Sequence, residues 1–276
     1  MITLKQFAVQ FIDWVDHSQS LEKKSRQYYR HGWNLLSATR LSDEKLDRIK
    51  NRDCDTLLFP GGAANANTAL RTLRRMFSHA QELELVEQAP KIRLRKEWPR
   101  SVSMTQQQAN AILAHMPDGD PRDVLSILRA TGMRPGEAYG MRWEFVGWEE
   151  KIYRNPKGKT KSARRPVPLL DPSGAVLVRR HLAQGSPARG WVFPAISSSG
   201  HRTSIQKAFV RARNLAGLPK EYVIYSARHG AATDIASVVS LKEVMNILGH
   251  SDMATALRYQ HPATENLQAR LNQKLQ

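Results

Sequence analysis

Apolar side chains recur at helical spacing along most of this chain, and this pattern restricts the fold more than any other feature. Leu4, Phe7, Phe11 and Val15 open the series, and the same spacing continues through residues 28–36. One side of each such helix is apolar, so these helices have to pack against one another. The first part of the chain is therefore expected to be an all-helical lobe.

A glycine-rich stretch at residues 61–65 interrupts the pattern, and a further helix follows it. Asn67 is expected to cap this helix, whose inward face carries the apolar residues of the segment 70–80. Three arginines are left on the opposite face: Arg71, Arg74 and Arg75. They are candidate phosphate contacts, although a solvated helix face would have the same pattern.

Residues 91–100 mark the expected domain boundary. They contain five positive charges and one proline, and the helical pattern stops there. We predict a helical domain over residues 1–95, a basic linker over 96–103 and a second domain over 104–276. Candidate DNA contacts in or next to this boundary are Lys91, Arg93 and Arg95.

The second domain is predicted to be helical with one short strand region. Thr105 and Pro121 each start a helix, whereas residues 148–170 look like two strands joined by a basic turn. Seven basic residues and no acidic ones lie between Lys151 and Arg165, a density suited to a DNA backbone. The candidate contacts there are Lys157, Lys161, Arg164 and Arg165.

The charge of the chain indicates a polyanionic partner. Lys and Arg number 42 against 25 Asp and Glu, which gives a net charge of +17. Nucleic acid is the expected partner, a ribosomal or chromatin-type binder being one alternative. The single cysteine, Cys54, excludes a disulfide framework and suits a reducing cytoplasm. No segment approaches the roughly 18 apolar residues that span a bilayer, so no membrane partner is expected.

Two arginines lie near predicted helix starts. Pro135 suits the first position of a helix, which places Arg134 at its N-terminus. Ser226 is expected to cap another helix, with Arg228 in its first turn. Two guanidinium groups could neutralise both free oxygens of one phosphate and the extra charge of a pentacoordinate transition state, without a metal ion.

The last distinctive segment joins a glycine, a histidine and a tyrosine. Gly249 is expected to end a helix, His250 follows it, and Tyr259 lies nine residues later on the next predicted helix. Viewed alone, Tyr259 is expected to be a half-buried packing residue rather than a nucleophile, and His250 a turn histidine. A zinc site is less favoured, because the histidines of this region have no known ligand spacing and no thiolates join them.

Together these pieces resemble the tyrosine recombinase, or phage integrase, family. The family order is Arg, a hairpin Lys, His-x-x-Arg, Leu-Gly-His and then Tyr, and it is reproduced between about Thr105 and His261. The resemblance implies that Arg134 and Arg228 grip the phosphate, and that Lys159 is the hairpin lysine, with Lys161 as the alternative. It also implies the roles of the two remaining residues: His250 would hydrogen-bond the phosphate or the nucleophile, and Tyr259 would form a 3′-phosphotyrosyl bond.

One position departs from the family pattern. Tyr225 stands where the family has the His of His-x-x-Arg. With a reference pKa near 10, a tyrosine is a poor base at neutral pH. We expect Tyr225 to position the phosphate by a hydrogen bond rather than to abstract a proton.

The resemblance also implies an assembly. The fold would be mainly α with a small antiparallel sheet, in which a SAM-like core-binding domain precedes the catalytic domain and no arm-site-binding domain precedes both. The enzyme would work without cofactors on double-stranded attachment sites, as a monomer when free and a homotetramer in the synaptic complex. The apolar stripe Leu267, Leu271 and Leu275 would form a tail helix on a neighbouring subunit.

The expected function is site-specific recombination for a phage or another mobile element, including integration of a viral genome. Xer-like resolution of chromosome dimers and type IB topoisomerase action share the same phosphotyrosine chemistry. The rival of another class is a DNA-binding or architectural protein whose active site has decayed at Tyr225.

Overall fold

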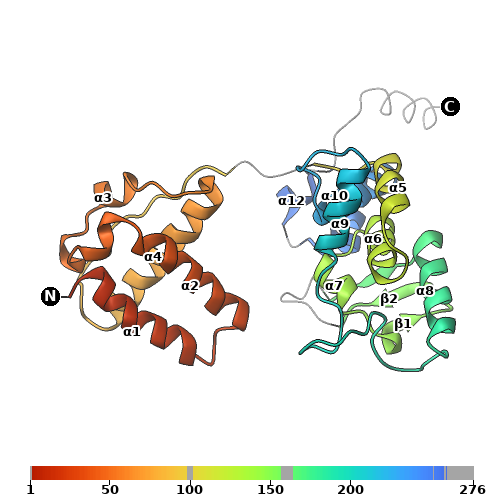
Figure 1. The fold of residues 1–276 in the computed structure, drawn as a ribbon, viewed down its shortest axis with the longest axis horizontal. Coiled ribbons are helices and arrows are strands. Elements are labelled where there is room, and N and C mark those ends of the chain that lie inside the picture. The colour runs from red at the N-terminus through yellow and green to blue at the C-terminus, as the bar shows by residue number, and fades with distance from the viewer. Residues whose placement is uncertain (1, 98–101, 157–163, 251, 258, 260–276) are drawn as a thin grey trace. The chain divides into compact units, whose positions relative to one another are not determined.

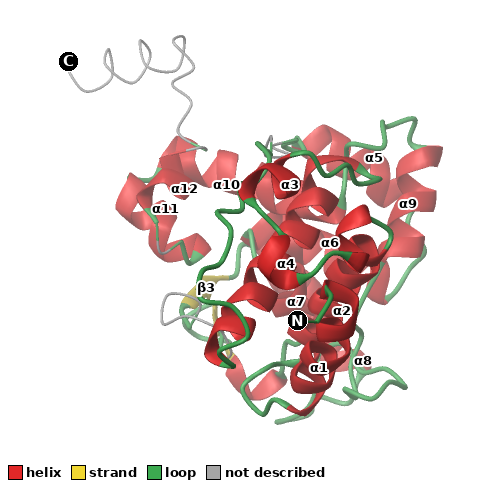
Figure 2. Cartoon of the chain, turned by 90° about the vertical axis from the view of Figure 1, so that its left-hand side faces the viewer, coloured by secondary structure: helices red, strands yellow, loops and turns green. Residues whose placement is uncertain are grey.

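The computed structural model describes residues 2–97, 102–156, 164–250, 252–257 and 259. Contacts within the chain divide it into two compact units, Met1–Pro99 and Arg100–Gln276 (Figure 1). Helices are the main secondary structure of both units, and the described strands form one small sheet (Figure 2). The prediction of a mainly helical chain with a small antiparallel sheet is therefore confirmed.

The first unit is a bundle of amphipathic helices. Its helices are α1 (Leu4–His17), α2 (Lys23–Ser37), η1 (Arg40–Asp43), η2 (Leu46–Arg48), α3 (Asn51–Asp55) and α4 (Gly62–Glu82). The predicted apolar faces meet in one core that includes Phe7, Phe11, Leu73 and Phe77. Fully burying one such side chain stabilises the fold by roughly 1.5–3 kcal/mol.

Helix α4 begins five residues before the predicted cap at Asn67. Gly61 adopts a left-handed conformation with φ +81° and stands at the N-cap position. Asn67 is instead buried inside the helix, where its side chain donates to Arg95 O at 2.8 Å and accepts from Arg95 N at 2.7 Å. The expected cap therefore anchors the extended segment after α4.

The second unit contains eight α-helices among its described residues. They are α5 (Gln106–His115), α6 (Asp120–Thr131), α7 (Pro135–Tyr139), α8 (Asp171–Ala183), α9 (Gln206–Leu215), α10 (Ile224–Val238), α11 (Leu241–Leu248) and α12 (Met253–Leu257). Buried side chains of α5, α6 and α9 contribute to the main core. A smaller apolar cluster is formed by side chains of α10, α11 and α12. Thr105 caps α5 as predicted.

The sheet has three antiparallel strands in the order β1-β2-β3. They are β1 (Val146–Gly147), which follows η3 (Trp143–Phe145), β2 (Ile152–Arg154) and β3 (Pro166–Pro168). Tyr153 pairs with Val167 and Arg154 with Pro166, as the predicted hairpin requires. The sequence showed no sign of β1, because two residues are too few for an alternating pattern.

Candidate active site

Arg228 lies at the centre of the candidate site and is 1% exposed. Its guanidinium donates to Gly132 O at 2.5 Å and to Leu248 O at 2.8 Å, the carbonyls at the ends of α6 and α11. Gly132 and Gly249 end these helices with φ +66°, a conformation that favours glycine. Two helix C-termini therefore direct their partial negative charge at one arginine. Burial nevertheless lowers the pKa of Arg228.

The start of α10 differs from the prediction. Val223 is the N-cap, and Ser226 lies inside the first turn, where its Oγ accepts from Val223 N at 3.1 Å. Arg228 is the fifth residue of α10 and follows that first turn. The free amides at a helix start therefore do not surround Arg228, and the carbonyls of two other helices hold it.

Arg134 is the N-cap of α7 and precedes Pro135, as predicted. Its side chain donates to Glu137 Oε1 at 2.9 Å and to Gly249 O at 3.1 Å. Arg165 donates to both oxygens of Glu137, at 3.3 and 3.2 Å. Burial opposes the ionised form of Glu137, but the hydrogen bonds and charges of Arg165 and Arg134 outweigh it and lower the pKa of this carboxyl. One carboxylate thus positions two arginines.

His250 lies directly after Gly249 and is buried. Burial, followed by the charges of Arg228, Arg134 and Arg165, lowers the pKa of His250 to about 4, so the ring is neutral at pH 7. Arg228 Nη2 lies 3.0 Å from His250 Nε2, and a guanidinium can only donate. The imidazole proton therefore sits on Nδ1, which is buried without a partner among the described residues. This N–H is a donor ready for an anionic oxygen.

Tyr259 lies two residues beyond the end of α12. The prediction that this tyrosine lies on a helix is therefore wrong. Its ring stacks 5.8 Å from the ring of His250 and lies 5.6 Å from that of His229. Its Oη is 2.7 Å from His229 Nδ1. No role at this site was predicted for His229, because its contact with Tyr259 joins residues thirty positions apart in the sequence.

A pocket of about 440 Å³ joins these side chains. Four predicted site residues line it, together with His229: Arg134, Tyr225, His250 and Tyr259. The Tyr225 ring is 39% exposed and lies 5.1 Å from the His229 ring. Arg228 lies behind the pocket and meets it through His250. The structure therefore brings together five of the six predicted catalytic residues.

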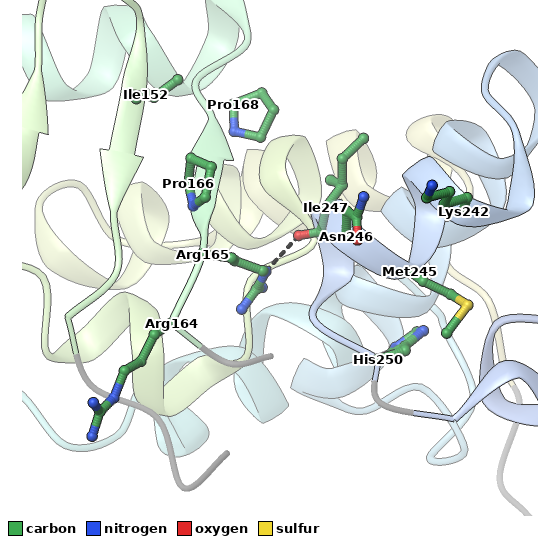
Figure 3. Close-up of a pocket in the computed structure, with 10 residues that line it drawn as sticks. All are labelled: Ile152, Arg164, Arg165, Pro166, Pro168, Lys242, Met245, Asn246, Ile247 and His250. Carbon is green, nitrogen blue, oxygen red and sulfur yellow. Dashed lines mark hydrogen bonds between the residues drawn. The ribbon is translucent and has the colours of Figure 1, made fainter. Parts of the chain in front are cut away.

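The sixth predicted residue, Lys159, lies outside the described residues, as do Lys157 and Lys161. The strands that flank this hairpin form one wall of a second pocket, of about 670 Å³, and α11 forms the other (Figure 3). Arg164 and Arg165 both line it. Arg165 is buried and donates to Ile247 O at 2.6 Å, so it joins β3 to α11 and its contact with DNA remains a prediction.

The predicted DNA contacts of the first unit make several bonds within that unit. Arg74 Nε donates to Ile92 O at 2.9 Å, and Arg95 donates to Asp55 O at 2.6 Å. Arg75 pairs with Glu82 at 2.8 Å, and Arg71 lies 3.5 Å from Glu97. The exposed members of the set are Arg71, Arg74, Lys91 and Arg93. Arg74 and Arg95 therefore attach the extended segment after α4 to α4 and α3.

Among the described residues, the His, Cys, Asp and Glu side chains form no group of three that could hold a metal ion. None of the described helices combines the length and the apolar character needed to cross a bilayer.

Comparison with known proteins identifies the family. The model of the phage integrase family matches residues 102–266. The tyrosine recombinase XerD of Proteus mirabilis is 28% identical over 94% of this chain and 89% of its own length. XerD of Yersinia pestis is 27% identical over 94% of this chain and 93% of its own length.

Solved structures share the fold. An integrase of the transposon Tn1549, bound to a circular intermediate DNA, has a TM-score of 0.75 and 18% identity over 99% of this chain and 100% of its own. A lambda integrase dimer bound to a core site has a TM-score of 0.76 and 18% identity over 95% of this chain and 96% of its own. Because the family model covers more than half of the sequence, the chain belongs to the phage integrase family, and the prediction of a tyrosine-type site-specific recombinase is confirmed.

Proposed function

We propose that Tyr259 is the nucleophile with which this enzyme cuts DNA. Its Oη would attack a phosphodiester, form a 3′-phosphotyrosyl bond and release a 5′-hydroxyl. A 5′-hydroxyl from another strand would later attack this bond and rejoin the DNA. The covalent bond conserves the energy of the phosphodiester, so neither ATP nor a metal is needed. The observation that carries the proposal is the convergence of Tyr259, His250 and Arg134 on one pocket.

The charges around the pocket suit this chemistry. Arg134, Arg165 and Arg228 supply three positive charges and Glu137 one negative charge, which leaves two net positive charges. A phosphodiester carries one negative charge, and its pentacoordinate transition state carries two. Cations fixed before the reaction stabilise the second charge as it develops. We assign a direct phosphate contact to Arg134, which lines the pocket, whereas the family resemblance alone implies one for Arg228.

His250 would add a neutral hydrogen bond to the same phosphate. Its Nδ1–H is buried and unpaired among the described residues, whereas Nε2 accepts from Arg228. Because this donor is buried, a phosphate oxygen that reaches it would gain a hydrogen bond at a low desolvation cost to the donor. Tyr225, which lines the same pocket, would donate a further hydrogen bond.

Two parts of the proposal rest on the family resemblance. Lys159, or Lys161 in its place, would be the hairpin lysine; both lie between β2 and β3 in the sequence. Residues 1–95 would be the core-binding domain, 96–103 the linker and 104–276 the catalytic domain. The basic side chains named above would follow the DNA backbone, each phosphate contact adding to the salt dependence of binding.

Partners and location follow from the same resemblance. A lambda integrase tetramer bound to a Holliday junction has a TM-score of 0.72 over 94% of this chain and 78% of its own. We propose a homotetramer on two paired sites, acting in the cytoplasm on the DNA of a mobile element. Xer-like resolution of chromosome dimers is compatible with the XerD relatives.

Covalent trapping tests the nucleophile. Wild type and Tyr259→Phe are incubated with a nicked suicide duplex that both proteins bind, beginning with the attachment site of the element that encodes the chain. A covalent band on denaturing gels that is lost in Tyr259→Phe supports the proposal. Binding without any band in the wild type would favour a DNA-binding protein with a decayed site. Relaxation of supercoiled DNA without strand exchange would favour topoisomerase action.

A further inference from the structure

His229 contacts the reacting oxygen from outside the family pattern. It follows Arg228 on α10, and its Nδ1 lies 2.7 Å from Tyr259 Oη. The two residues are thirty positions apart, so the contact depends on how α10 packs against Tyr259, which follows α12. Both side chains line the pocket of about 440 Å³ in which we place the phosphate.

His229 also lies on the helix face from which the family histidine is missing. Residues four apart on an α-helix lie one above the other, so Tyr225 and His229 share one face of α10. Their rings meet edge to face at 5.1 Å and 64°. The imidazole that the pattern places at position 225 is thus replaced by an imidazole one turn further along the same face.

The attack on phosphorus requires an acceptor for the phenolic proton of Tyr259. Tyr225 is a poor one, because a phenol with a pKa near 10 holds its own proton at neutral pH. His250 is another poor one, since its Nε2 accepts from Arg228 and its Nδ1 carries the proton. A neutral His229 can place its lone pair on Nδ1, at hydrogen-bond distance from the reacting oxygen.

We propose that His229 is the general base that takes the proton of Tyr259. As the Tyr259 Oη–P bond forms and the P–O5′ bond breaks, the phenolic proton passes to His229 Nδ1. The electron pair of the broken bond leaves with the 5′ oxygen, which takes a proton from water and becomes a 5′-hydroxyl. During rejoining the imidazolium returns its proton to Tyr259. This inference rests on the proposed role of Tyr259 as nucleophile.

The surroundings of His229 limit when it can act. The titratable and charged groups that line the pocket with it are Arg134, Glu221, Tyr225, His250 and Tyr259. Arg134 opposes a second positive charge, and Glu221 favours it. The transferred proton also meets the negative charge that develops on the phosphate, so the imidazolium forms at the moment when the pocket gains an anion.

The test measures the rate of covalent trapping between pH 5.5 and 9.5 on the nicked duplex described above. The wild-type rate should rise with pH and level off once His229 is neutral. His229→Ala should be slower by about 10²- to 10⁴-fold at pH 7, the usual contribution of a general base. Its rate should climb without a plateau toward the pKa of tyrosine, near 10. His115→Ala, an exposed histidine at the end of α5, is the matched control and should match the wild type.

Two further variants separate proton transfer from structural support. His229→Gln keeps a polar side chain at the position but has no basic nitrogen, so it should be as slow as His229→Ala. If His229→Ala fails to bind the duplex, His229→Gln provides the measurement in its place. Tyr225→His combined with His229→Ala places an imidazole one turn earlier on the same face. The trapping rate of this double variant should be at least tenfold higher than that of His229→Ala. A His229→Gln variant with wild-type rate and pH profile would overturn the inference.

A modified substrate identifies which proton is involved. When sulfur replaces the bridging 5′ oxygen, the leaving group needs no proton, whereas the tyrosine still has to lose one. The defect of His229→Ala should therefore persist on this duplex, and its disappearance would overturn the inference. In the same gels, loss of the adduct in Tyr259→Phe supports Tyr259 as the nucleophile. The proposal for Tyr259 and the proposal for His229 can therefore fail independently of each other.

Discussion

Arg228 Nη2 lies 3.0 Å from His250 Nε2, and this contact fixes the direction of the hydrogen bond. A guanidinium cannot accept, so His250 has to accept at Nε2 and is held neutral with its proton on Nδ1. The site therefore places a neutral donor next to fixed cations. Its response to pH and to single substitutions follows from that arrangement.

The stability of the second unit should fall in acid because of His250. Its pKa is about 4 in the folded chain, and an unfolded histidine has a pKa near 6.5. Between these values the unfolded state binds more protons, so stability is fully present above about pH 6.5 and is lost as the pH falls toward 4. His250→Gln removes this proton and should show a smaller loss of melting temperature between pH 7.5 and 5.0. An equal loss in wild type and variant, with His115→Gln as control, would contradict the prediction.

Arg228→Lys should abolish most of the trapping while DNA binding persists. A lysine is a point donor and cannot serve Gly132, Leu248 and His250 together as the guanidinium does. We expect a loss of about 10²- to 10³-fold in adduct formation, as for other preorganised charges. Arg180→Lys, a largely buried arginine on α8 that pairs with Asp120 and Asp123, is the matched control. It should lower the melting temperature without changing the trapping rate per folded molecule.

Glu137→Gln should destabilise the unit and slow trapping. The carboxylate is 9% exposed and pairs with Arg134 and Arg165, so its loss leaves two partly or fully buried cations without their anion. Breaking a buried pair in this way costs about 3–5 kcal/mol. Urea unfolding followed by tryptophan fluorescence measures the effect. Glu150→Gln, which removes an exposed pair with Arg154, is the control and should unfold like the wild type.

The sequence was informative where local chemistry determines the structure. Pro135 and Gly249 mark a helix start and a helix end, so Arg134 and His250 could be placed beside them. The amphipathic faces of α1 and α4 followed from spacing alone. Motif order then predicted roles that single residues could not indicate.

Contacts between distant segments could not be predicted from local sequence. Arg165 was predicted as a DNA contact because the hairpin is basic; the structure adds its bonds to Glu137 and to a carbonyl of α11, and the DNA contact stays a prediction. Asn67 was expected at a cap because its residue type favours caps, but bonds to Arg95 hold it within α4. His229 was missed because no local pattern predicts its bond to Tyr259.

Tyr225→Phe should be less active than Tyr225→His. The phenylalanine keeps the ring packed beside His229 but cannot donate to the phosphate, and one lost hydrogen bond of about 1 kcal/mol corresponds to several-fold in rate. The histidine restores both a donor and a second imidazole on the same face of α10. Trapping rates of the two variants at pH 7 provide the measurement. Equal rates in Tyr225→Phe and the wild type would exclude a positioning role for the hydroxyl.

Lys159→Ala should differ from every pocket variant in its response to the leaving group. If the hairpin lysine relays the proton from water to the departing 5′ oxygen, sulfur at that position removes the need for this relay, and Lys159→Ala should recover toward the wild-type rate. Arg228→Lys should not recover on the same duplex, because the charge on phosphorus is unchanged. Lys161→Ala, two residues away in the same basic hairpin, is the matched control. Recovery confined to Lys161→Ala would reassign the role to that lysine, and recovery in neither would mean that the proton comes from elsewhere.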